Sequence, residues 1–110
     1  MSNLFRRFFQ YLRYREAVKK ADKAHAQTGE RYYVMPTVNG KLIVMDRANF
    51  RIMKKKHYLN PNAKVRDLIN ESFYMTPYRL GNGYLDKKGR RIKLLLYYSW
   101  CDAYRKKQKK

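Results

Sequence analysis

The stretch RYYVMPTVNGKLIVM, residues 31–45, decides the fold of this chain. Its two arms are rich in β-branched and aromatic residues, which favour strands, and Asn39-Gly40 lies between them. Asn-Gly is the preferred pair for a type I′ two-residue turn, because both positions tolerate a positive φ angle. The stretch therefore predicts an antiparallel hairpin. Pro36 cannot donate a ladder hydrogen bond, so we expect its strand to be a sheet edge at that point.

The central part of the chain predicts two short helices and a further strand. Asp46 can cap a helix over residues 47–58, and Asn62 can cap a second helix before residue 72. Residues 72–76 then predict a strand, and Tyr84-Leu85 is a candidate for a brief return to the sheet. Two short helices joined by a tight corner also allow a helix-turn-helix interpretation of residues 47–72, although the usual turn glycine is missing.

The C-terminal segment begins with a polar, basic turn over residues 86–91. Apolar and small residues then recur at helical spacing, which favours a helix although residues 92–100 also alternate at the strand period. This predicted face comprises Ile92, Leu95, Leu96, Ser99, Trp100 and Ala103. Residues 105–110 contain no acid and are expected to form a frayed basic tail. The whole pattern predicts an α+β fold in which a small antiparallel sheet, a hairpin at 31–45 plus a strand at 72–76, packs against N-terminal, central and C-terminal helices.

Residues 1–29 predict a basic amphipathic helix that precedes a small domain at 30–104. Residues 4–28 contain neither proline nor glycine, and Gly29 follows as a C-cap. One apolar stripe comprises Phe5, Phe8, Phe9 and Leu12, and a second, on another side, comprises Tyr14, Ala17, Val18, Ala21 and Ala24. One straight helix cannot bury both stripes against one flat core. Either the helix breaks near residues 11–14, or the first stripe engages a partner groove, a second copy of the chain or an anionic membrane surface.

The composition restricts the partner more than the chemistry. The 110 residues include 27 lysines and arginines against 8 acids, a formal charge of +19, together with 11 tyrosines. Such a charge favours a polyanionic partner and exceeds the roughly 2 to 8 that keep a small domain soluble. The 15% aromatic content argues against disorder, and no apolar run is long enough for a membrane span or a signal peptide. The single cysteine, Cys101, favours a reducing compartment, so we expect a cytoplasmic protein.

The sequence lacks the patterns of catalytic and metal sites. His25, His57 and Cys101 are far apart in the chain and do not have the spacing of zinc ligands. Gly81-Asn82-Gly83 lacks the rest of a phosphate-binding loop. We therefore expect a protein that is not an enzyme and that needs no cofactor or metal.

Clusters of cations beside aromatic residues predict nucleic-acid binding, because cations contact phosphates while exposed rings stack on unpaired bases. The expected contact residues are Lys54, Lys55, Lys56, Tyr58, Tyr84, Lys87, Lys88, Arg90, Arg91, Arg105, Lys106 and Lys107. Separated clusters without a sequence-reading module suit an irregular RNA, such as a ribosomal surface, better than one DNA groove. The alternatives are DNA binding by residues 47–72, and an adaptor that docks on a membrane surface or protein partner through Phe5, Phe8, Phe9 and Leu12.

Three short segments carry a resemblance to a group of proteins. RYYVMP at 31–36, KLIVMDR at 41–47 and FYMTPY at 73–78 resemble segments of small uncharacterised basic proteins of Bacteroidota genomes. The resemblance spans about residues 31–78 and carries no function with it. It implies a bacterial cytoplasm.

Overall fold

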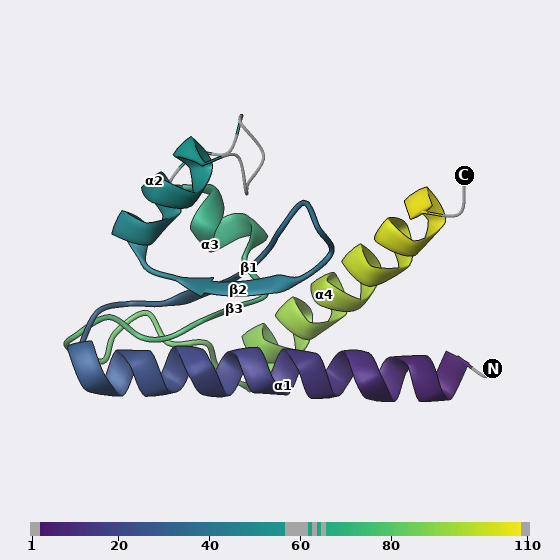
Figure 1. Cartoon of the computed structure of the whole chain (residues 1–110). Helices are drawn as coiled ribbons and strands as arrows, with labels where there is room; N and C mark the ends of the chain where they lie inside the picture. Colours follow the sequence, from purple (N-terminus) through teal and green to yellow (C-terminus); the bar gives the residue numbers. More distant parts are fainter. Residues whose placement is uncertain (1–2, 57–61, 63, 65, 109–110) are drawn as a thin grey trace.

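The computed structural model describes residues 3–56, 62, 64 and 66–108, and these form an α+β fold, as predicted (Figure 1). Its elements are α1 (Asn3–Thr28), β1 (Tyr33–Pro36), β2 (Leu42–Met45), α2 (Arg47–Lys55), α3 (Asp67–Glu71), β3 (Tyr74–Met75) and α4 (Lys87–Gln108). The strands form one antiparallel sheet with the order β2-β1-β3. In Figure 1, α1 runs beneath the sheet, α2 and α3 lie above it, and α4 diverges from α1 towards the C-terminus.

The sheet separates two apolar cores because side chains alternate between its faces. Tyr33 and Met45 point to one face, where they pack with Phe50 of α2 and Leu68 of α3. Val34 and Tyr74 point to the other face, where the core is completed by α1 and α4. On that side Ala21 and Tyr97 are almost fully buried. A chain of this length therefore builds a helix–sheet–helix sandwich from strands of four residues or fewer.

The hairpin is present, but its turn differs from the predicted type. The Gly40 N–H donates to the Thr37 carbonyl at 3.2 Å, and the Thr37 N–H donates to the Lys41 carbonyl at 2.9 Å. The loop between the paired residues is therefore three residues long, with Gly40 at φ 79°. A β-carbon at Gly40 would lie 2.6 Å from the Tyr104 ring of α4. Glycine is required here both by its positive φ angle and by this close packing.

Pro36 lies on the central strand, but at a point where no third strand of the described part of the chain pairs with it, so its lack of an N–H donor costs no ladder hydrogen bond. The ladder between β1 and β3 pairs Tyr33 with Met75 and Val34 with Tyr74. Pro36 pairs with Leu42 of β2 and lies beyond the end of the β3 ladder. Its missing N–H therefore leaves the described ladders intact.

The central helices confirm one predicted cap and correct another. The Asp46 carboxylate accepts the Asn49 N–H at 2.8 Å, which caps α2 as expected. The predicted end of this helix at residue 58 lies outside the described residues. The next helix, α3, begins only at Asp67 and has Arg66 as its N-cap residue, so Asn62 does not cap it. Tyr84 and Leu85 do not join the sheet, because its described strands are β1, β2 and β3 alone.

Helix α4 is longer than predicted and buries a different face. Asp86 accepts the Gly89 N–H at 2.6 Å, and residues 87–91, predicted as a turn, form the start of the helix. Its last turn includes residues 105–108, which were predicted to fray. On the predicted apolar face, Ile92, Leu95 and Leu96 are 57%, 53% and 39% exposed. Of the predicted face, Trp100 does contact the core, and the other contacts come from Leu94, Tyr97, Tyr98 and Cys101, which were not predicted to face it.

Helix α1 is continuous, so it does not break near residues 11–14. Tyr14, Ala17 and Ala21 are buried against the sheet and α4. The other stripe stays outside: Phe5, Phe8, Phe9 and Leu12 are 61%, 55%, 50% and 38% exposed. The structure therefore selects the arrangement in which only the alanine-rich stripe docks on the domain.

Candidate nucleic-acid interface

The predicted phosphate contacts lie at three separate places. Lys54, Lys55 and Lys56 are at the C-terminal end of α2, and Arg105, Lys106 and Lys107 are in the last turn of α4. Cations at these two ends offset the partial negative charge of a helix C-terminus, so each cluster also has a structural explanation. In Figure 1 the two helix ends lie far apart, on different sides of the hairpin. These clusters do not form one continuous surface.

The third cluster has no such structural explanation. Lys87, Lys88, Arg90 and Arg91 occupy the start of α4, where no acid is present in the first turn. Cations are unfavourable there because the helix N-terminus carries a partial positive charge. Arg90 lies over the Tyr74 ring at 5.5 Å, and all four side chains are exposed. The helix dipole therefore gives no reason for this cluster.

Only one of the two predicted stacking residues can be placed. Tyr84 is 68% exposed and lies three residues before the cluster of Lys87, Lys88, Arg90 and Arg91, which we call the α4 cluster. Tyr58 lies outside the described residues.

The structure also contains a basic cleft that was not predicted. An arginine-rich cleft of about 820 Å³ opens where the end of α1, the start of α2 and the loop after β3 meet. Its lining includes Arg31, Arg47, Arg51 and Arg79, with Tyr33 and Tyr78 as its aromatic walls. We call this site the arginine cleft.

Arg31 forms the floor of the arginine cleft and holds the loop after β3 in place. Its side chain is buried, its Nε donates to the Thr76 carbonyl at 2.9 Å, and its Nη2 donates to the Gly83 carbonyl at 2.7 Å. The guanidinium also lies 4.1 Å from the centre of the Tyr78 ring. Burial raises the pKa of the Tyr33 hydroxyl, and the charges of Arg31 and Arg47 oppose that rise. The buried Arg31 guanidinium therefore places a positive charge beside the Tyr33 and Tyr78 rings.

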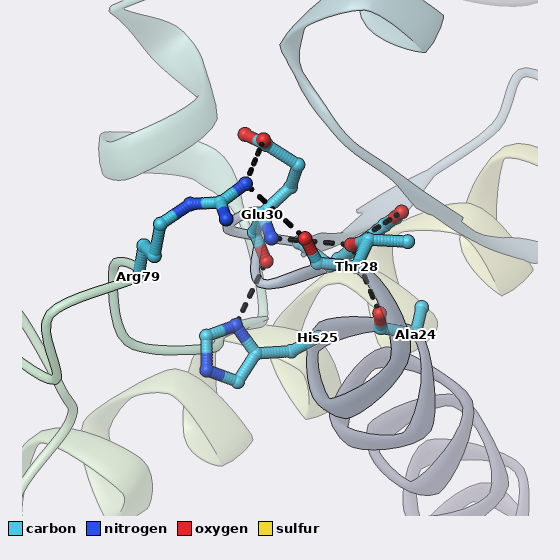
Figure 2. Close-up of polar contacts among 6 residues, drawn as sticks. Ala24, His25, Thr28, Glu30 and Arg79 are labelled. Carbon is cyan, nitrogen blue, oxygen red and sulfur yellow. Dashed lines mark hydrogen bonds and ion pairs between the residues drawn. The ribbon is translucent and has the colours of Figure 1, made fainter.

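Figure 2 shows how the rim of the cleft is tied to the end of α1. Arg79 Nη2 donates to Glu30 Oε1 at 2.8 Å and to the Thr28 carbonyl at 3.2 Å. His25 Nδ1 donates to the Glu30 carbonyl at 2.8 Å, and the Glu30 N–H donates to Thr28 Oγ1 at 3.1 Å. Arg79 is thus paired, and one of the two acids lining the cleft is neutralised by it.

The remaining two arginines are available to a ligand. Arg47 and Arg51 are one turn apart on α2, both are exposed, and neither makes a hydrogen bond or ion pair with a residue that the structure describes. The nearby Asp46 is occupied by capping α2. Their i, i+4 spacing could have been read from the sequence. The sequence alone could not have assigned Arg31 and Arg79 to the same site, because only the fold brings them to the cleft of Arg47 and Arg51.

The described residues give no support to the other chemistries considered. In this part of the chain no three His, Cys, Asp or Glu side chains are grouped to bind a metal ion. Burial raises the pKa of the half-buried Cys101 thiol, which disfavours a reactive thiolate. No helix within the described ranges is both long and apolar enough to cross a bilayer. The helix pair considered for DNA ends in α3, whose five residues begin and end with acids, so it gains no support as a recognition helix.

Comparisons of this chain with protein-family models, with curated proteins and with solved structures found no match.

Proposed function

We propose that this protein is a non-enzymatic, sequence-tolerant nucleic-acid-binding protein that prefers unpaired or irregularly folded RNA. The observation that carries the proposal is the arginine cleft, whose lining includes Tyr78 together with Arg47 and Arg51, two arginines that form no hydrogen bond or ion pair with a described residue. Arginine guanidinium groups bind phosphates with paired N–H donors, and tyrosine rings stack on bases. The α4 cluster with Tyr84 provides a second contact region of the same chemistry.

The shape of the basic surface favours RNA over duplex DNA. The cleft, at about 820 Å³, is in the size range of small-ligand sites and suits one or two unpaired nucleotides, not a double helix. The basic regions are also separated, which suits a backbone that bends and changes direction. Duplex DNA would require a groove-filling element, and α3 is too short to supply one.

A salt titration with a labelled single-stranded RNA tests the proposal. We expect the wild-type affinity to fall steeply as salt rises, with a log–log slope of several units. Removing two phosphate contacts in R47A/R51A should weaken binding and reduce the slope by about 1.4, at roughly 0.7 per contact on a single strand. The variant K20A/K41A removes the same charge from exposed positions outside the cleft, and we expect it to stay close to wild type.

Several results would contradict the proposal. A flat salt dependence, or no RNA binding at low salt, would reject nucleic-acid binding altogether. Equal effects of R47A/R51A and K20A/K41A would reject the cleft as the contact site. Tighter binding to duplex DNA than to RNA in the same titration would reject the preference for RNA.

A further inference from the structure

The first half of α1 is an apolar surface that the domain leaves uncovered. Leu4 is 79% exposed, and Phe5 and Phe8 are each more than half exposed, because the sheet is out of their reach. We call Leu4, Phe5, Phe8, Phe9 and Leu12 the phenylalanine stripe. Figure 1 shows the reason: the N-terminal part of α1 extends well beyond the end of the strands. The stripe therefore needs an occupant from outside the domain.

An apolar hollow adjoins this stripe. It measures about 530 Å³ and is lined by Leu4, Phe5, Arg7, Phe8, Tyr11 and Tyr98. The one cation among them, Arg7, is already engaged: its guanidinium donates to Asp102 at 2.7 Å and lies 4.5 Å from the Tyr98 ring centre. Its charge is therefore already paired, and the other lining residues form an apolar surface continuous with the stripe.

The charges around the stripe identify the kind of occupant. Residues 3–15 contain four arginines and no acid. In the second half of α1, the side that continues the stripe carries three exposed cations and two exposed acids: Arg15, Lys19 and Lys23, with Glu16 and Asp22. One side of a helix about 39 Å long thus passes from aromatic and aliphatic residues, flanked by arginines, to charged residues among which the cations outnumber the acids.

We propose that this side of α1 docks on an anionic lipid surface. An amphipathic helix of this composition lies in the membrane interface, with its phenylalanine and leucine side chains among the acyl chains and its cations at the lipid phosphates. A second copy of the chain is disfavoured, because pairing two stripes would bring together arginine-rich segments without an acid between them. RNA is disfavoured at this surface, because Leu4 and Leu12 have no ring for a base to stack on. The inference is independent of RNA binding by the arginine cleft, which lies at the other end of α1.

Vesicle binding by the full chain tests this proposal. The probes are vesicles of phosphatidylglycerol mixed with phosphatidylcholine, and vesicles of phosphatidylcholine alone, at about 0.15 M salt. We expect the wild-type protein to bind the anionic vesicles and F5S/F8S/L12S to bind them at least about tenfold more weakly. The matched control I92S/L95S/L96S removes three exposed apolar side chains from α4 at unchanged charge, and its affinity should stay within about twofold of wild type.

A spectroscopic measurement separates insertion from adsorption by charge alone. The variant F5W has two tryptophans, the introduced one and the native Trp100. Brominated lipids should quench the fluorescence of the introduced tryptophan, because its ring is expected to lie about 5–10 Å into the membrane interface. The emission of wild-type protein under the same conditions gives the background to subtract.

Four outcomes would overturn the proposal: no wild-type binding to the anionic vesicles, unchanged binding by F5S/F8S/L12S, equal loss in the α4 control, or no quenching in F5W. Loss of RNA binding by F5S/F8S/L12S with vesicle binding retained would assign the stripe to RNA instead. A wild-type dimer in sedimentation that this variant abolishes would assign it to a second copy. If RNA binding fails while the vesicle results hold, the proposed function falls and this inference stands.

Discussion

The two halves of α1 belong to one uninterrupted helix and yet behave in opposite ways. The second half has small residues, and Ala21 is fully buried, whereas the first half has large apolar residues that remain half exposed. Hydrophobicity alone predicts the reverse. Burial here depends on what a residue can reach: β1 and β2 span only about 13 Å each, so they cover less than half of a helix about 39 Å long. The comparison teaches that the larger apolar stripe is exposed by position and not by composition.

The largest expected effect is at the buried stripe. Ala21→Asp places a carboxylate at a site with no exposed surface, and we expect it to lower the free energy of unfolding by more than about 3 kcal/mol. Ala26→Asp makes the same change at an exposed position of the same helix and should cost less than about 0.7 kcal/mol. Urea unfolding measures both. Similar losses in the two variants would mean that the second half of α1 is not packed as described.

A smaller effect is expected where Tyr14 joins α1 to the strand region. Its hydroxyl donates to the Phe73 carbonyl at 2.7 Å in a buried setting, so Tyr14→Phe should lower the free energy of unfolding by about 1–1.5 kcal/mol at neutral pH. Thermal or urea unfolding measures the loss. Val18→Ala, which trims a half-buried side chain beside the same core, is a control for loss of packing without loss of a hydrogen bond.

The same tyrosine predicts a pH dependence. Burial raises the pKa of Tyr14 to about 12, against about 10 in an unfolded chain. Between these values the unfolded state releases the proton first, so stability present below pH 10 is lost as pH rises, by up to about 1.4 kcal/mol per pH unit for this group. The free energy of unfolding, measured from pH 8 to 11.5, should fall less steeply with pH in Tyr14→Phe than in the wild-type protein. Titration of the lysines and the raised pKa values of Tyr74 and Tyr97 affect the stability of both proteins alike, so only the difference between the two curves reports on Tyr14. Parallel curves would contradict the prediction.

Arg7 is the main polar link between the exposed half of α1 and α4. Its ion pair with Asp102 has a distance of 2.7 Å, but both side chains are partly solvated, so Arg7→Ala should cost only about 0.5–1 kcal/mol. A double-mutant cycle with Asp102→Ala should give a coupling of about 0.5 kcal/mol. Hydrogen exchange should quicken in the first turns of α1 and not in the second half. Uniform quickening along α1 would show that the two halves are not energetically distinct.

The smallest effect is expected at the phenylalanine stripe. Phe5→Ser and Phe8→Ser should each change the free energy of unfolding by less than about 0.5 kcal/mol, because both rings are already mostly in solvent. A loss above about 2 kcal/mol, or one that depends on protein concentration, would show that the stripe is buried in solution and would remove the contrast between the two halves.

Local patterns predicted most of the elements, and the errors have physical causes. The hairpin, the long first helix and the Asp46 cap follow from strand propensity, from the absence of helix breakers and from short-range hydrogen bonding. The prediction that Ile92, Leu95 and Leu96 of α4 face the core was wrong, because it gave more weight to regular spacing than to side-chain size. Tyr97 and Trp100 pack against Phe73, with ring centres 5.3 and 5.6 Å from it, and burial of the large Tyr97 ring outweighs the more regular Ile92–Leu95–Leu96 series.

The candidate site was only partly predictable for a similar reason. The α4 cluster can be read directly from consecutive residues, and the structure leaves it exposed. The arginine cleft combines four arginines from three segments, two of them from α2, and no short window of sequence contains all four. Their convergence depends on the fold, which brings the chain after α1, the start of α2 and the loop after β3 to one cleft. Predictions from charge runs therefore found the solvated clusters and missed the arginine cleft.

By itself, the sequence determined the excess of positive charge, the alternation that makes a two-sided sheet, and two apolar stripes on α1 that no flat core could bury together. Only the tertiary structure decided which stripe is covered and which arginines share a cleft. The physical reason is that burial is a competition for a limited sheet surface. Alanine allows the second half of α1 to approach the short strands closely, and the phenylalanines, beyond the reach of those strands, remain exposed.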